Sequence, residues 1–218
     1  MIPMYRLPGT FAKAATVVTG IGVAMCVLVH SGCVSPVSDY RAVDPSACYG
    51  LDSISFSSPS GPGWSFFEGR DEQVKYTAFL KKGNLPPHGF VAGVVEITSE
   101  DNVRTTDEMW AKVVEPVLGR MMSMERFQLT DKRVEVSDRF GTPSIRYHIT
   151  GKDAGAPDKG NADYITLRAH GHAIVHPERD NTFVVMVFLE RGHEDQMSED
   201  TESRARELLD GLVLRPCE

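Results

Sequence analysis

The chain has 218 residues, of which 41% are hydrophobic and 24% are charged, and 30 acidic against 23 basic residues give a net charge of −7. A chain of this length can bury a core as a single domain without metals or several disulfides. The acidic balance argues against nucleic acid as a partner, because a negative surface repels phosphate and the sequence has no Lys/Arg cluster with interleaved aromatic residues.

The first 32 residues have the features of a secretory signal peptide. They include Arg6 and Lys13 but no acidic residue. Thr16–Val29 is a run of uncharged and mostly apolar residues, shorter than the roughly 20 residues needed to span a bilayer. We therefore expect an exported precursor from which residues 1–32 are cleaved. The alternative is an uncleaved N-terminal helix, with Cys33 an ordinary thiol.

The segment ends in Val29-His-Ser-Gly-Cys33, which resembles the lipobox of bacterial lipoproteins, where small residues precede a diacylated cysteine. His30 departs from this pattern, which usually has an apolar residue there. The resemblance implies lipidation of Cys33, and two acyl chains anchor a protein stably because each buried methylene contributes about 0.8 kcal/mol. Val34 follows the cysteine where inner-membrane lipoproteins of proteobacteria tend to carry Asp. The resemblance thus implies an outer-membrane lipoprotein that faces the periplasm.

Lipidation of Cys33 would leave Cys48 and Cys217 as a pair in an oxidising compartment. They lie near the two ends of the mature chain, and the ends of a domain are often close in space. We expect them to form a disulfide, which would stabilise the fold by roughly 5 kcal/mol in the chain-entropy model. The alternative is two unpaired thiols near flexible termini.

Residues 33–47 lack any periodicity and are expected to form a lipidated tether, followed by a single domain over residues 48–218. The first half of this domain shows short apolar runs between turn residues. Strands are expected near 54–56 and at 64–68, 74–80 and 90–98.

A helix is expected to begin at Thr105, whose spacing to Glu108 makes a capping box, and to run to about Met124. Its apolar residues form one broad stripe that faces the core, and its methionines are interpreted as core filling rather than as metal ligands. Pro116 lies on the opposite face and predicts a kink.

The second half of the domain is predicted to be an antiparallel meander followed by a helix. The expected strands are 127–136, 144–150, 164–175 and 182–190. The closing helix is expected at about 198–210, ended by Gly211, and 212–214 can add a short strand.

This order of elements resembles the PsbP-like α/β sandwich family, named for the extrinsic protein P of photosystem II. The resemblance covers roughly Ser53 to Leu214 and rests on Pro62-Gly-Trp64 after a short first strand, a long mid-chain helix, a meander and a closing helix. It implies an α+β fold, an antiparallel sheet with helices packed on its faces as an α/β/α sandwich. It also implies an accessory or assembly role without a shared catalytic centre, so no catalytic residues are carried over.

The most pointed local feature is Arg168-Ala-His-Gly-His172. On a strand, His170 and His172 project from one face about 7 Å apart, and His148 joins that face if its strand pairs with theirs. Three imidazoles can bind a transition metal, which makes these histidines a candidate metal site. The alternative is a solvated or helix-covered polar face, on which Arg146 and Arg168 would repel a cation.

Motifs of enzymatic chemistry are absent from the sequence. His193-Glu-Asp-Gln-Met197 lacks the second histidine of a zinc-protease motif, and no nucleophile elbow, dinucleotide-binding loop or Walker loop occurs. The resemblance to the PsbP-like family, rather than this absence, implies a non-enzymatic lipoprotein without a cofactor, which would bind or scaffold another envelope component through the polar sheet face or the loops at 61–64 and 82–89. The alternatives are a metal-binding lipoprotein and a hydrolase whose site is assembled from distant residues.

Overall fold

The computed structural model describes residues 40–70, 72–100, 103, 105–121 and 127–215. The signal segment 1–32, Cys33 and Cys217 lie outside these residues, so cleavage and lipidation stay predictions. Within the described part of the chain, no helix is both long enough and apolar enough to cross a membrane.

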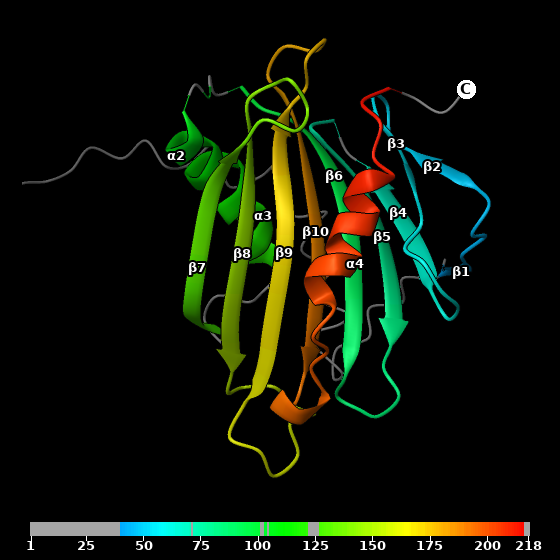
Figure 1. Cartoon of the computed structure of the whole chain (residues 1–218), viewed down its shortest axis with the longest axis vertical. Coiled ribbons are helices and arrows are strands. Elements are labelled where there is room, and N and C mark those ends of the chain that lie inside the picture. Colours follow the sequence, from blue (N-terminus) through cyan, green and yellow to red (C-terminus); the bar gives the residue numbers. More distant parts are fainter. Residues whose placement is uncertain (1–39, 71, 101–102, 104, 122–126, 216–218) are drawn as a thin grey trace, which may run out of the picture.

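The centre of the fold is an eight-stranded antiparallel sheet in the order β1-β4-β5-β6-β10-β9-β8-β7 (Figure 1). Its strands are β1 (Arg41–Ala42), β4 (Ser65–Arg70), β5 (Val74–Lys82), β6 (Gly89–Thr98), β7 (Phe127–Ser137), β8 (Ser144–Asp153), β9 (Ile165–Val175) and β10 (Thr182–Gly192). A small hairpin of β2 (Cys48–Gly50) and β3 (Ser55–Ser57) lies beside it. The strands expected from alternation and from apolar runs are confirmed.

Helices cover both faces of this sheet, which makes the fold an α+β sandwich in which the sheet dominates. On one face lie α2 (Thr106–Met109), the π-helical turn η1 (Trp110–Val114) and α3 (Glu115–Met121), packed on one apolar cluster. On the other face, α4 (Thr201–Asp210) and the β2–β3 hairpin pack on a second cluster. A short 3₁₀ turn, η2 (Glu194–Gln196), precedes α4. β10 is buried along its whole length because both layers cover it.

The capping box that predicted the first helix is present. The backbone N–H of Glu108 donates to Thr105 Oγ1 at 3.2 Å, and the Glu108 carboxylate accepts from the Thr105 N–H at 3.2 Å. Ahead of Pro116 the helix widens into a π turn, in which the Glu115 N–H donates to the Trp110 carbonyl five residues back. Proline lacks an N–H and crowds the carbonyl four residues earlier, so the irregularity falls next to Pro116.

The domain starts earlier than the expected boundary at residue 48. Arg41 and Ala42 form β1 and pair with Phe66 and Ser65 of β4. The Arg41 guanidinium lies 4.3 Å from the centre of the Phe66 ring and forms an ion pair with Glu68. Residues 40–47, which were expected in the tether, therefore belong to the fold. The sequence gives no sign of this, because these side-chain contacts carry no signal in local periodicity.

Trp64, at the end of the exposed loop 61–63, contributes to the core. Trp64 is 5% exposed and packs edge-on against Phe188, with Phe90 beside it. Phe66 is likewise buried. Neither aromatic side chain is therefore exposed for contact with a partner.

Cys48 begins β2 and is disulfide-bonded, with its partner outside the described residues. The segment after α4 runs beside the same hairpin, since Val213 forms an isolated antiparallel bridge with Ser55 of β3. The chain thus approaches its C-terminus in the small layer that holds Cys48. Cys217 as the partner stays a prediction.

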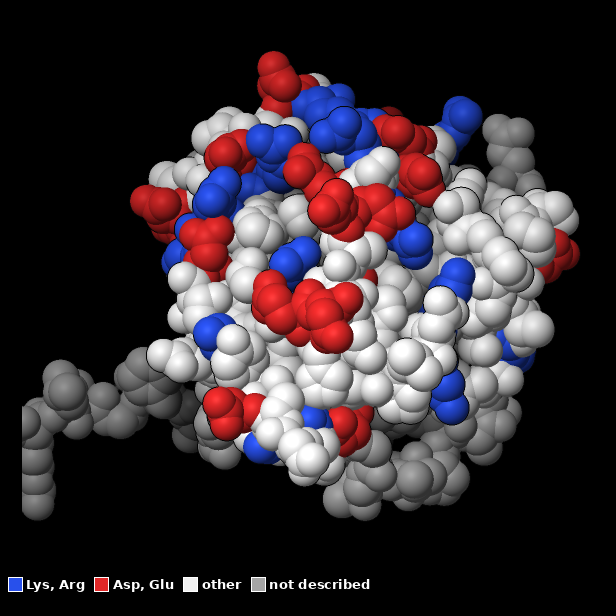
Figure 2. Space-filling view, turned by 60° about the horizontal axis from the view of Figure 1, so that its bottom comes forward, with Lys and Arg blue, Asp and Glu red and all other residues white. Residues whose placement is uncertain are grey.

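Charged side chains of both signs lie intermingled on the face shown in Figure 2, without a broad basic area. This distribution matches the acidic composition, in which basic residues are the minority.

Candidate functional site

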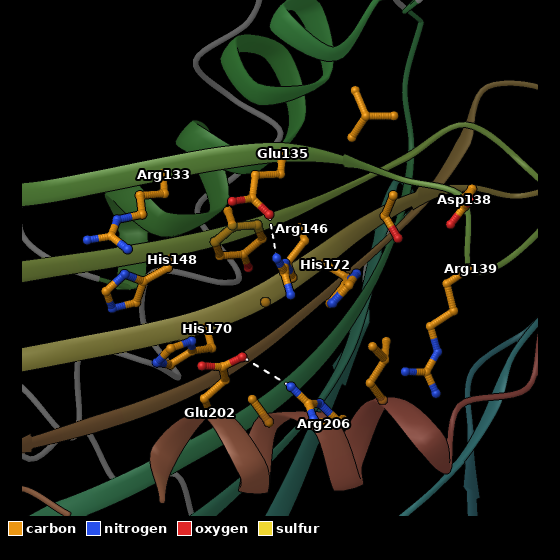
Figure 3. Close-up of a pocket in the computed structure, with 16 residues that line it drawn as sticks. Arg133, Glu135, Asp138, Arg139, Arg146, His148, His170, His172, Glu202 and Arg206 are labelled. Atoms are coloured by element: carbon orange, nitrogen blue, oxygen red, sulfur yellow. Dashed lines mark hydrogen bonds and ion pairs between the residues drawn. The ribbon is translucent and has the colours of Figure 1, made fainter. Parts of the chain in front are cut away.

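A polar groove lies between α4 and the three strands β7, β8 and β9 (Figure 3). Helix α4 packs over β10 and β9 and leaves this face of β8 and β7 without a covering helix. The groove has a volume of about 430 Å³. It is lined by Arg133, Glu135, Val136, Ser137, Asp138, Arg139, Arg146, Tyr147, His148, His170, Gly171, His172, Glu202, Ala205, Arg206 and Leu209.

The floor of the groove consists of two rows of side chains that cross the three strands. In one row, Arg133 of β7 pairs in register with His148 of β8, which pairs with His170 of β9. This row confirms that the strand of His148 pairs with that of His170 and brings both histidines to one face. Strand pairing is the cause, because residues directly opposite each other on neighbouring strands project from the same face of the sheet.

The second row lies two residues further along the same strands. Glu135 of β7 pairs with Arg146 of β8, which pairs with His172 of β9. Arg146 donates to Glu135 in an ion pair across the strands, drawn as a dashed line in Figure 3. The Arg146 guanidinium holds the pKa of the Glu135 carboxyl below its usual range. The floor therefore has charged groups on β7 and β8 and imidazoles on β8 and β9.

The two imidazoles of the first row stack on each other. The ring centroids of His148 and His170 are 4.4 Å apart and the ring planes are inclined by 28°. Burial lowers the pKa of His170 from 6.5 to about 4, and the neighbouring His148 adds to the shift. Burial also lowers the pKa of His148, although the negative charge of Asp131 acts to raise it. Both rings are therefore neutral near pH 7, which allows them to touch.

The third histidine of the expected metal site lies apart from this pair. The ring of His172 faces Phe140, with centroids 6.4 Å apart, and burial lowers its pKa to about 4. Stacked rings present their faces to each other, whereas a metal needs ring nitrogens directed at one point roughly 2.0–2.1 Å from each. Among the described residues, no group of three or more His, Cys, Asp or Glu side chains is placed to hold a metal ion. The expected three-histidine shell is not formed there, because strand pairing aligned two of the rings face to face.

The arginines at the groove are each engaged with a carboxylate. Arg133 lies 3.3 Å from Asp131, and Arg139 pairs with Asp210. On α4, one turn separates Arg206 from Glu202, and their charged groups are 3.2 Å apart. The groove thus offers prearranged donors and acceptors of both signs rather than a single strong charge.

A second polar cluster surrounds the buried carboxylate of Glu190 on β10, which is 0% exposed. His88 Nε2 lies 2.8 Å from its Oε1, and Ser198 Oγ donates to the same oxygen at 2.9 Å. Thr201 donates to its Oε2. Ser198 and His88 thus each contact the Glu190 carboxylate, and this arrangement differs from a catalytic triad, in which the serine is hydrogen-bonded to the histidine. The cluster fastens the loop before β6 and the start of α4 to β10.

Sequence reasoning missed the Glu190 cluster, because its members lie up to about a hundred residues apart. The one local signal is an acidic residue at the end of an otherwise apolar strand. A buried charge at such a position requires partners.

No protein-family model matches the sequence, and no curated protein matches it. Solved structures with a similar arrangement include the Ran-binding protein Mog1p of Saccharomyces cerevisiae, with 9% identity and a TM-score of 0.39 over 77% of this chain and 95% of that chain. A mutant of Mog1 gives 9% identity and a TM-score of 0.40 over 78% of this chain and 97% of the other. Values this low carry no argument about the function of this protein.

Proposed function

We propose that this protein is a lipid-anchored lipoprotein of the cell envelope, most simply at the outer membrane and facing the periplasm, that binds another envelope protein without catalysing a reaction. The observation that carries the binding role is the groove between α4 and β7–β9, which is lined by paired charges and by partly buried imidazoles. The anchoring role rests on the signal-like residues 1–32 and on the lipobox resemblance at Cys33.

The lining of the groove supports a protein partner. Pockets for small molecules are mostly apolar with a few polar groups, whereas this lining is dominated by arginine, histidine and acidic side chains. Arginine is enriched in protein interfaces, and ion pairs such as Arg206 with Glu202 can exchange partners with groups on an incoming chain.

The Gly83–Gly89 loop supplies a second exposed feature. Leu85 at its tip is 67% exposed, while Gln196 donates to the carbonyl oxygens of Leu85 at 3.4 Å and Pro86 at 3.5 Å. The loop is therefore held in place with an apolar side chain toward solvent. It is a smaller candidate contact than the groove, because a single exposed leucine is common on protein surfaces.

The PsbP-like resemblance supports the same proposal. Helices on both faces of an antiparallel sheet are the arrangement that the family implies, and its members mostly act as accessory or assembly proteins. An accessory protein that is tethered close to a bilayer would meet its partner at the membrane surface.

Photo-crosslinking in intact cells tests the proposed binding role. A photoreactive residue in place of Arg139 or Arg206 at the groove should capture one protein, identified by mass spectrometry and recovered reciprocally from that protein. The matched control is Lys112, on the opposite helical layer. Equal capture from the groove and control positions, or none from either, would contradict the groove as the binding site.

A further inference from the structure

Strand β7 forms one edge of the sheet and has only β8 as a partner among the described strands. Its 11 residues are mostly exposed, in contrast to the two-residue strand β1 at the other edge. Leu129 and Val136 on β7 are 45% and 76% exposed. A long edge strand with free backbone groups and exposed apolar side chains is a template for pairing with another strand.

The regular part of β7 is its second half. The register with β8 shifts between Leu129 and Asp131, and from there Asp131–Ser137 pairs without interruption. Val134 is the middle residue of this stretch. Arg133 and Glu135 flank it with opposite charges, and because they are two residues apart on a strand they share one face, the groove floor.

We propose that β7 pairs antiparallel with β7 of a second copy of this chain, about a two-fold axis at Val134. In this register Asp131–Ser137 of one copy lies along the same seven residues of the other, so the whole regular stretch is used. Each Arg133 then stands opposite Glu135 of the second copy, twice in the interface. A self-complementary patch of this kind is what a two-fold interface requires.

Charge selects this register over its neighbours. An axis at Arg133 would place arginine opposite arginine and Asp131 opposite Glu135. An axis at Lys132 or at Glu135 would place each of these residues opposite its own copy. Like charges directly opposite on a sheet are destabilising, and an axis between residues would put groove-face residues opposite residues of the other face.

Lys132 does not block the pairing. Lysine on an edge strand often prevents association, but the Lys132 ammonium lies 4.8 Å from the centre of the Trp110 ring on the helical layer of its own chain. In the proposed register its aliphatic stem stands opposite Val136 of the second copy and covers that exposed side chain.

Pairing of the two edges would also place the two grooves side by side. Arg133 and Glu135 belong to both the groove floor and the interface. A dimer would therefore present one wide polar surface bounded by two α4 helices. This consequence goes beyond the proposed function, and the dimer itself can be tested without any envelope partner.

Cysteine crosslinking of the full-length, membrane-bound protein tests the register. The Val134→Cys variant should form a covalent dimer with a short thiol-specific crosslinker, since the two side chains would be about 5 Å apart across the axis. Val136→Cys alone should not, whereas copies with Val136→Cys and Lys132→Cys should crosslink when co-expressed. Equal yields for Val134→Cys and Val136→Cys alone, or no crosslinking in any combination, would overturn the proposal.

Charge reversal gives a second test that does not depend on cysteine geometry. Arg133→Glu makes the flanking pair all acidic and Glu135→Arg makes it all basic, so each variant alone should dimerise roughly tenfold more weakly. Differently tagged copies of the two variants, co-expressed, should regain association with each other. An unmodified protein that stays monomeric throughout a concentration series, or a mixture that associates no better than the single variants, would refute the interface.

Discussion

The imidazole of His148 stacks on that of His170 across β8 and β9, with ring centroids 4.4 Å apart. Two rings can lie this close only while at least one is neutral, because two imidazolium charges at this separation repel each other. The register of β8 and β9 brings the two rings together, so protonation of both imidazoles would weaken the contact. The packing of the groove floor should therefore depend on pH.

Acid should destabilise the protein in the range set by these histidines. Burial lowers the pKa of His170 and of His172 from 6.5 to about 4 in the folded state. The unfolded chain therefore binds more protons between these values, and stability falls as the pH drops from 6.5 toward 4. His170→Gln should lose less stability over this range than the unmodified protein, measured as thermal midpoints at pH 7, 5.5 and 4. Parallel pH profiles for the two proteins would contradict the role of His170.

Transition metals should not bind stoichiometrically to the groove. The stacked rings of His148 and His170 do not direct their nitrogens at one point, and His172 faces Phe140. Isothermal calorimetry with zinc, nickel and copper should give no saturable heat at micromolar concentrations. Saturable binding that disappears in the His170→Ala/His172→Ala double variant would instead restore the metal-binding hypothesis.

Gly171→Ala should strongly destabilise the sheet. A Cβ atom at this position would lie 2.2 Å from the Met186 carbonyl oxygen and 2.3 Å from the Tyr147 ring, which crosses Gly171 to donate a hydrogen bond to Met186. We expect a loss of about 2–3 kcal/mol in the free energy of unfolding, measured by denaturant titration. Gly160→Ala is the control, since a Cβ atom there would meet no atom within 4 Å. Its positive φ of 61° alone should cost about 1 kcal/mol of stability. Equal losses for the two variants would contradict this prediction, because they would mean that the neighbouring atoms move to accommodate the Cβ atom at Gly171.

Glu190→Gln should loosen the start of α4 and the loop before β6. The carboxylate of Glu190 accepts hydrogen bonds from Ser198 and Thr201 and contacts His88 in a fully buried site. We expect a loss of about 1–3 kcal/mol, with faster hydrogen exchange confined to these segments. The control is Glu202→Gln, which removes an exposed ion pair and should change stability by less than about 1 kcal/mol. Faster exchange spread evenly over the sheet would contradict a local fastening role.

Cys33→Ser should release the protein from the membrane fraction and abolish labelling by a fatty-acid analogue. Serine has no thiol to carry the acyl chains, which the lipobox resemblance implies are the membrane anchor of the mature protein. Cys48→Ser should keep both the label and the membrane location, and non-reducing mass spectrometry of the unmodified protein should show Cys48 joined to Cys217. A labelled Cys33→Ser protein would refute lipidation at that residue.

Local patterns predicted the long strands and the two main helices of the described chain. Alternation in 164–175 places His170 and His172 on one face, and the spacing of Thr105 and Glu108 predicts the helix start that the structure has. These features depend on residues within a few positions of each other, which is why sequence reasoning reached them. It placed the start of the packed domain too late, because the contact of Arg41 with Phe66 joins segments that carry no common pattern.

By itself, the sequence determined the acidic balance and the strands with their polar and apolar faces, and it predicts an export signal, since each of these depends on composition or on neighbouring residues. Only the tertiary structure decided that α4 leaves β7 and β8 uncovered, that His148 and His170 stack instead of sharing a metal, and that β7 lies at an edge. These features depend on strand order and side-chain orientation, which result from packing among segments far apart in the chain. The polar face of β9 was therefore predictable, and the groove built on it was not.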